Sequence, residues 1–174
     1  LYVIVLGITS LVINNFIINS VILSSLFYTL SCIFIYKISL LIFQSEYSPL
    51  KYFDNTKISV KLISLLVAIL TAFTVRIVWS ALSGMETTMF TFFCIAGVYY
   101  HIKNLQSAKF NLLPTLFLSL AAVSRPEGYL LFVLYGLDVL ANLIKDKALK
   151  ANLLKVISAV ILFSAVTLPY LIFS

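Results

Sequence analysis

The chain has 174 residues, of which 62% are hydrophobic and 10% are charged, and its net charge is +6. Soluble domains are about half apolar and about a quarter charged. A core of this size therefore cannot hide all of the apolar surface, and lipid is the expected solvent for much of it. The basic residues lie between apolar runs and form no stripe interleaved with aromatic residues, which argues against a nucleic-acid partner.

About seven apolar segments follow one another along the chain. Because a helix needs about 20 residues to cross the hydrocarbon core, we predict an all-α, polytopic transmembrane bundle whose fifth and sixth helices are short. The first residue is Leu1 and the last lies inside an apolar run, so we expect a single transmembrane region, residues 1–174, that is a fragment of a longer membrane protein. The segments cover residues 1–18, 20–43, 60–82, 86–102, 111–124, 127–144 and 156–174.

The connections between these segments alternate in charge. Those at about 44–61, 101–110 and 145–155 are rich in lysine, and the three between them contain none. Lysine-rich loops face the cytoplasm in membrane proteins, so the other three are expected to face outward. A single helix over 111–144 would place the lysines of 145–155 outside, and the charge pattern therefore favours two short helices that meet at Pro126.

Two short polar motifs stand before apolar segments and share the pattern S-x-x-E, the signature of a capping box. In such a box the serine hydroxyl accepts a hydrogen bond from the backbone N–H three residues later, and the glutamate reaches back to the serine N–H. Pro126 would fall in the first turn, where a missing N–H costs little. Capping alone is a sufficient explanation of both glutamates. The motifs are Ser83-Gly84-Met85-Glu86 and Ser124-Arg125-Pro126-Glu127-Gly128.

The same motifs also suit an anion site at the outer face, because helix N-termini carry a positive dipole end that favours phosphate. Arg125 would add a full charge, and Arg76 lies about two turns before Ser83. The fifth segment rises about 21 Å, less than the hydrocarbon thickness of about 30 Å. We therefore expect Arg125 and Glu127 to lie below the membrane surface, where ionisable groups mark functional sites or buried ion pairs. Both interpretations stay open.

The other polar groups inside apolar segments have simpler explanations. Lys37 lies near a helix end and can extend its charge to the lipid headgroups. Asp138 is expected to take part in a hydrogen bond inside the protein, and His101, beside Lys103, to lie at the interface. No Cys/His spacing predicts a metal site.

Residues 79–87, Trp-Ser-Ala-Leu-Ser-Gly-Met-Glu-Thr, are followed by a helix, a basic turn, a short helix and the Ser124-Arg125-Pro126-Glu127-Gly128 motif. This order resembles the GT-C membrane glycosyltransferases, in the branch that includes mycobacterial arabinofuranosyltransferases and mannosyltransferase-like enzymes that use polyprenyl-phosphate sugars. In that branch a "W…SG-ET" motif precedes "RPEG" by about 40 residues, and here Glu86 and Arg125 are 39 residues apart. The resemblance is specific over about residues 60–145.

The resemblance implies hexosyl or pentosyl transfer from a polyprenyl-phosphate-linked sugar to a glycan, lipid or protein acceptor in the cell envelope. The site would face outward from a bacterial or archaeal plasma membrane. Arg125, assisted by Arg76, would bind the donor phosphate. The residues expected to support the site or cap its helices are Ser83, Gly84, Glu86, Ser124, Pro126, Glu127 and Gly128.

The family's catalytic Asp lies in the first extracytoplasmic loop, whereas this chain has no acidic residue before Glu46. We therefore expect the catalytic Asp upstream of this fragment and assign no catalytic residue within it. The resemblance leaves a divalent metal as an option for the whole enzyme, and this fragment is expected to hold no cofactor.

Two alternatives remain open. A transporter or flippase can also aim broken-helix N-termini at an anion. Such proteins often show inverted repeats and polar groups near mid-membrane, whereas here no repeat is seen and the polar residues gather toward one face. The second alternative is a non-catalytic membrane scaffold, in which both glutamates are caps and both arginines are structural.

Overall fold

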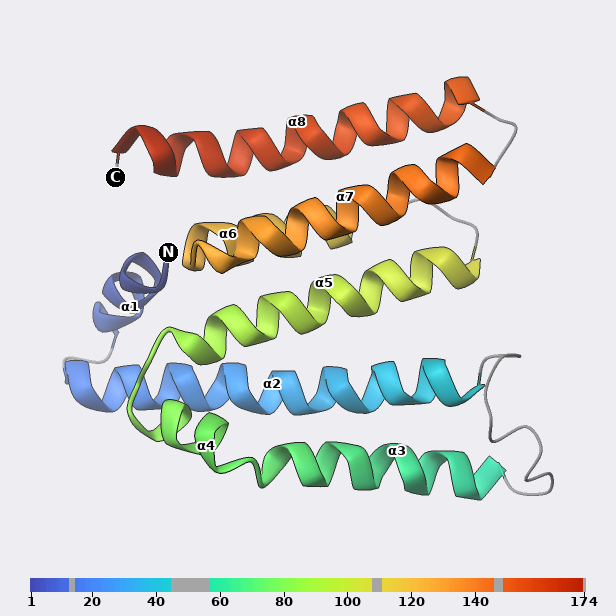
Figure 1. Cartoon of the computed structure of the whole chain (residues 1–174). Coiled ribbons are helices and arrows are strands. Elements are labelled where there is room, and N and C mark those ends of the chain that lie inside the picture. The colour runs from blue at the N-terminus through green and yellow to red at the C-terminus, as the bar shows by residue number, and fades with distance from the viewer. Residues whose placement is uncertain (13–14, 45–56, 108–110, 146–148, 174) are drawn as a thin grey trace. The chain divides into compact units, whose positions relative to one another are not determined.

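In a computed structural model of the chain (Figure 1), the described residues are 1–12, 15–44, 57–107, 111–145 and 149–173. Within these ranges the protein is all-helical and contains no strand, which confirms the predicted all-α class. The helices are α1 (Tyr2–Ser10), α2 (Phe16–Gln44), α3 (Lys57–Ala72), α4 (Val75–Leu82), α5 (Thr87–Ser107), α6 (Leu113–Ser124), α7 (Glu127–Lys145) and α8 (Leu149–Phe173).

The break between the first two helices lies earlier than the sequence predicted. The predicted segments end at residue 18 and resume at residue 20, whereas α2 follows Asn15. The Asn15 side-chain oxygen accepts hydrogen bonds from the N–H groups of Ile17 and Ile18, both at 3.2 Å. Asn19 lies inside α2 and is buried, because its amide donates to the Leu6 carbonyl and to Thr9 Oγ1. Asn19, which the sequence predicted to lie between two helices, thus makes a polar contact that joins α1 and α2.

The segment predicted as one helix over 60–82 is two helices. Residues 60–72 and 75–82 meet at an angle of 58°. Thr74 lies between them with extended backbone, φ −68° and ψ 104°. The expected single helix at this place was therefore wrong. By contrast, the predicted break before residue 127 is confirmed, since α6 ends at Ser124 and α7 begins at Glu127.

By length and composition, α2 is the one helix among the described residues that could cross a membrane by itself. The bent pair of α3 and α4 meets the same criteria only when its two helices are taken together, and α6 and residues 156–172 are apolar but shorter. The predicted alternation of loops across the membrane depends on the lysine-rich connections at about 44–61, 101–110 and 145–155. Of their lysines, Lys51, Lys109 and Lys147 lie outside the described residues.

In α2 the distribution of polarity between the buried and exposed faces is inverted. Each residue of α2 that is buried is polar, and they are Asn19, Ser24, Ser31 and Ser39. Large aliphatic side chains occupy most of the exposed positions of the same helix. In α8, Thr167 and Ala159 are buried, while Val160, Ile161 and Leu168 are exposed. A helix core in a water-soluble protein has the opposite arrangement. The exposed aliphatic residues of α2 are Ile17, Ile18, Ile22, Leu26, Ile33 and Ile42.

The chain divides into two compact units, Tyr2–Ile95 and Ala96–Ser174, here called the N-terminal and C-terminal units, and α5 crosses the boundary between them. In the N-terminal unit α2 packs against α1, α3 and α4, and α2 and α3 lie side by side in Figure 1. The rings of Phe27, Phe92 and Phe93 form a cluster with centroids 5.5–5.9 Å apart. These contacts join α2 to the beginning of α5.

In the C-terminal unit α6 packs against both α7 and α8. Its buried face carries small residues, including Ala121 and Ala122, which allow helix backbones to approach closely, as in membrane helix pairs. The rings of Phe132 and Phe163 stack with centroids 3.6 Å apart and join α7 to α8. Small residues thus bring α6 close to its neighbours, and aromatic rings fill the contact between α7 and α8.

Candidate functional site

The first predicted motif forms the turn between α4 and α5 in the N-terminal unit. Ser83 ends α4, and its hydroxyl donates to the Trp79 carbonyl at 2.7 Å. The predicted capping box at this place was wrong, because the hydroxyl that should cap α5 belongs to the last turn of α4. Glu86 immediately precedes α5 and contributes its carbonyl, which accepts from the Phe90 N–H.

Side chains from α1 and α2 donate hydrogen bonds to the backbone of this turn. The Tyr2 hydroxyl donates to the Gly84 carbonyl at 2.7 Å, and the Ser24 hydroxyl donates to the Met85 carbonyl at 3.2 Å. Gly84 itself has φ +65°, which is the left-handed region that favours glycine. The conformation of Gly84 therefore sets the backbone path from α4 to α5. Its role in supporting a donor site stays a prediction.

Replacement of Gly84 by alanine should lower the free energy of unfolding by about 2 kcal/mol or more. The new Cβ would lie 2.5 Å from Ser20 Oγ and 3.0 Å from Ser20 Cβ, and the positive φ would add strain. Thermal unfolding in detergent measures the effect. Adding Ser20→Ala should restore part of the loss, because it removes the hydroxyl and leaves the backbone strain. A Gly84→Ala variant as stable as the wild type would contradict this account.

The second motif forms the break between α6 and α7 in the C-terminal unit. The Ser124 hydroxyl donates to the Leu120 carbonyl at 2.7 Å, so Ser124 completes α6 and the second predicted capping box was also wrong. Arg125 is extended, with φ −149° and ψ 143°, and its N–H donates to the Ala121 carbonyl. Pro126 follows it, and the residue before a proline favours such extended geometry. Glu127 is the first residue of α7.

Arg125 and Glu127 form an ion pair across this break. Arg125 Nη2 lies 3.2 Å from Glu127 Oε1, and the two side chains are 34% and 60% exposed. The pair that the sequence allowed as a structural alternative therefore exists, but it is not buried. The carboxylate lies in the first turn of α7, where the helix dipole favours a negative charge. The guanidinium is thus oriented beside a helix N-terminus and remains accessible.

Arg76, the other predicted phosphate ligand, lies on α4 and is exposed. It belongs to the N-terminal unit, whereas Arg125 belongs to the C-terminal unit. Their convergence on one donor phosphate stays a prediction.

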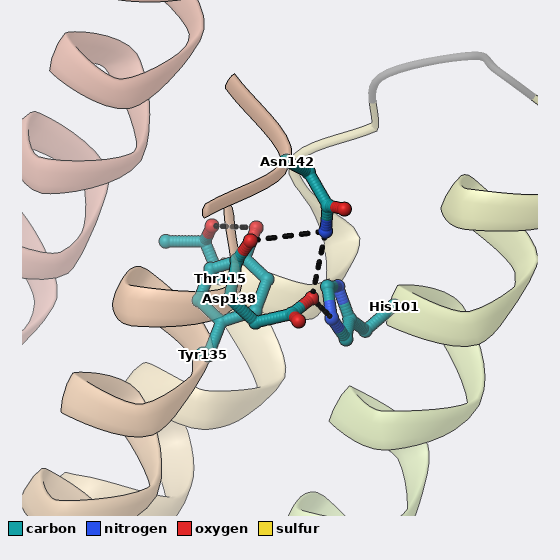
Figure 2. Close-up of polar contacts among 5 residues, drawn as sticks. All are labelled: His101, Thr115, Tyr135, Asp138 and Asn142. Carbon is teal, nitrogen blue, oxygen red and sulfur yellow. Dashed lines mark hydrogen bonds and ion pairs between the residues drawn. The ribbon is translucent and has the colours of Figure 1, made fainter. Parts of the chain in front are cut away.

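A polar cluster that the sequence did not predict lies in the C-terminal unit (Figure 2). His101 Nε2 on α5 is 2.8 Å from Asp138 Oδ2 on α7. The same oxygen accepts from Asn142 Nδ2 at 3.1 Å. The rings of Tyr135 and His101 meet edge to face, with centroids 5.0 Å apart, and Thr115 Oγ1 donates to the Tyr135 hydroxyl at 3.3 Å. The cluster therefore connects α5, α6 and α7.

Asp138 thus forms a predicted hydrogen bond, and its partner is His101, which the sequence placed at the interface. The prediction that this bond lies inside the protein was wrong, because the Asp138 side chain is half exposed. The two positions are 37 residues apart on different helices. No local spacing marks such a pair. The one available signal was that each is an ionisable residue within or next to an apolar segment.

The contact between His101 and Asp138 should make the effects of mutating the two residues on the free energy of unfolding non-additive. Alanine substitutions made singly and together should give a double-mutant-cycle coupling of about 1 kcal/mol, because the pair joins two helices but Asp138 is half exposed. Denaturation of the purified protein in mixed micelles measures the four free energies of unfolding. Additive single effects would show that the contact contributes nothing.

No group of three or more His, Cys, Asp or Glu side chains suited to a metal ion occurs in the part of the chain that the structure describes. No protein-family model matches the chain, and the searches of curated proteins and of solved structures also found no match.

Proposed function

We propose that the chain is an integral membrane protein. The inverted polarity described above supports this proposal, because lipid solvates the exposed Ile and Leu side chains of α2 and α8 at no cost. The buried Ser, Thr and Asn side chains donate to helix carbonyls or to each other, as expected where no water competes. The predicted polytopic arrangement of about seven spans belongs to this proposal.

Within the membrane, we propose that the chain is part of a GT-C-like glycosyltransferase that uses a polyprenyl-phosphate sugar as donor. The observation that carries this proposal is the accessible Arg125 guanidinium, paired with Glu127 at the break before α7. It occurs within the second of the two motifs that together carry the resemblance to the family. A guanidinium binds phosphate through two parallel charge-assisted hydrogen bonds.

In this proposal Arg125 binds the donor phosphate and stabilises the charge that develops there as the sugar leaves. Glu127 orients the guanidinium through the 3.2 Å contact. The acceptor is a glycan, lipid or protein hydroxyl on the extracytoplasmic side. The carboxylate that deprotonates this hydroxyl is assigned to no residue of the chain.

Sugar transfer by the full-length protein in membranes tests the proposal directly. Membranes that contain the protein are supplied with radiolabelled polyprenyl-phosphate pentoses and hexoses, and label in the acceptor fraction is measured beside membranes that lack the protein. Protein-dependent transfer from at least one donor is the expected result. Absence of transfer from every donor would contradict the enzyme proposal. Movement of the intact donor between leaflets would then point to the flippase alternative.

A further inference from the structure

The short helix α4 has a position and a surface that the proposed transfer reaction does not explain. It follows α3 after a bend of 58°. Transmembrane helices stand on average about 20° from the bilayer normal. If α3 has such a tilt, a bend of this size directs α4 away from the normal and toward the membrane surface.

The two faces of α4 differ in the size of their side chains. Ser80 and Ala81 are buried, and α4 packs against α2. Val75, Trp79 and Leu82 are exposed, and Trp79 is 70% exposed. Their spacing of four and three residues places these three on one stripe of the helix. The small residues therefore make the contact within the unit, and the large apolar residues point away from it.

Arg76, which is also exposed, lies next to Val75 along the same helix. If water surrounded α4, its apolar stripe would stay exposed to water. If hydrocarbon surrounded it, the Arg76 guanidinium and the Trp79 indole N–H would have no polar partner in the lipid. The boundary between headgroups and acyl chains satisfies all of these groups. Arginine there extends its charge to the lipid phosphates while its stem stays in the apolar layer, and tryptophan is enriched at the same depth.

We propose that α4 is an interfacial helix that lies in the boundary between headgroups and acyl chains of the bilayer. Its Val75-Trp79-Leu82 stripe inserts among the upper acyl segments, and Arg76 contacts lipid phosphates. This inference depends on the proposal that the chain is an integral membrane protein. It does not depend on the glycosyltransferase activity.

Trp79 makes this proposal directly testable, because it is the single tryptophan in the sequence. The full-length protein, with any further tryptophan outside residues 1–174 replaced by phenylalanine, is reconstituted into phosphatidylcholine vesicles. The vesicles contain lipids brominated either near the headgroup or deep in the acyl chain. Shallow bromines should quench the fluorescence of Trp79 more strongly than deep ones. Stronger quenching by deep bromines would overturn the proposal, since α4 would then continue the span of α3.

A matched variant calibrates the depth. Trp79→Phe combined with Ile33→Trp moves the fluorophore to an exposed position within α2. That variant should be quenched more strongly by deep bromines. Arg76→Leu should shift the quenching of Trp79 toward deeper bromines, because the charge no longer holds the helix at the phosphates. A purely donor-binding role of Arg76 predicts lost transfer with no such shift.

Two further outcomes distinguish the interfacial helix from the proposal that the chain is an integral membrane protein. No quenching of Trp79 by either lipid, with normal quenching of the Ile33→Trp variant, would show that protein covers the stripe and would overturn the interfacial helix. Failure of the protein to float with the vesicles after alkaline extraction would instead contradict membrane integration itself, and the interfacial helix with it.

Discussion

Replacement of Gly128 by alanine is expected to destabilise the C-terminal unit by about 3 kcal/mol or more. The added Cβ would lie 2.4 Å from the backbone nitrogen of Ala122 and 2.6 Å from the Ala121 carbonyl carbon and the Ala122 Cα. These are backbone atoms of α6, so no change of rotamer can relieve the overlap. The two helices would have to separate at the break that carries Arg125.

Gly136→Ala is the matched control for this prediction. Gly136 lies on the same helix, α7, but a Cβ there meets no atom within 4 Å. Alanine at that position should raise the free energy of unfolding by about 0.5–1 kcal/mol, since glycine is a poor residue for a helix interior. Thermal unfolding in detergent compares both variants with the wild type. Equal midpoints for the two variants would show that Gly128 is not a close contact.

The clash at Gly128 also differs in kind from that at Gly84. At Gly84 the nearest atom belongs to the Ser20 side chain, whereas at Gly128 the nearest atoms are all backbone. A second substitution can therefore relieve the first clash in part but not the second. Restoration of Gly128→Ala by Ala122→Gly would contradict this distinction, because removing the Ala122 side chain leaves the overlapping backbone atoms in place.

Arg125→Ala is expected to lower sugar transfer by about 100-fold or more while the protein still inserts into the membrane. Loss of one charge-stabilising donor at a reaction centre typically costs about 10²–10³ in rate. Arg125→Lys should give an intermediate rate, because lysine keeps the charge and loses the planar, two-pronged geometry. The measurement is initial transfer rate per amount of membrane-inserted protein, with Lys103→Ala as a control cation on α5.

Glu127→Gln separates phosphate binding from a structural role of the arginine. If Arg125 acts only through its ion pair with Glu127, removing either charge should have the same effect on transfer. If Arg125 binds the donor phosphate, Glu127→Gln should lower the rate by less than about tenfold, the usual scale for loss of an orienting contact of about 1 kcal/mol. Equal losses in the two variants would move the arginine into the scaffold interpretation.

The predictions for Asn19, Ser83 and Ser124 were wrong for a common physical reason. Asn19, Ser83 and Ser124 were read as loop or capping residues from local preference. In the structure Asn19 connects two helices, and the two serines bond to carbonyls of the helix that each one completes. In a chain with so few polar residues, each of them takes whichever carbonyl or amide the fold presents. Local pattern cannot decide between these partners.

The sequence by itself determined the helical class and the break at Arg125-Pro126, because apolar length and proline geometry are local properties of the chain. The bend between α3 and α4, the pairing of His101 with Asp138 and the contact of Gly128 with α6 were decided only by the tertiary structure. Each depends on a neighbour that is distant in sequence or on a backbone path set by packing. Hydrophobic periodicity predicts which residues are kept from water, but it does not predict which helix packs against those residues.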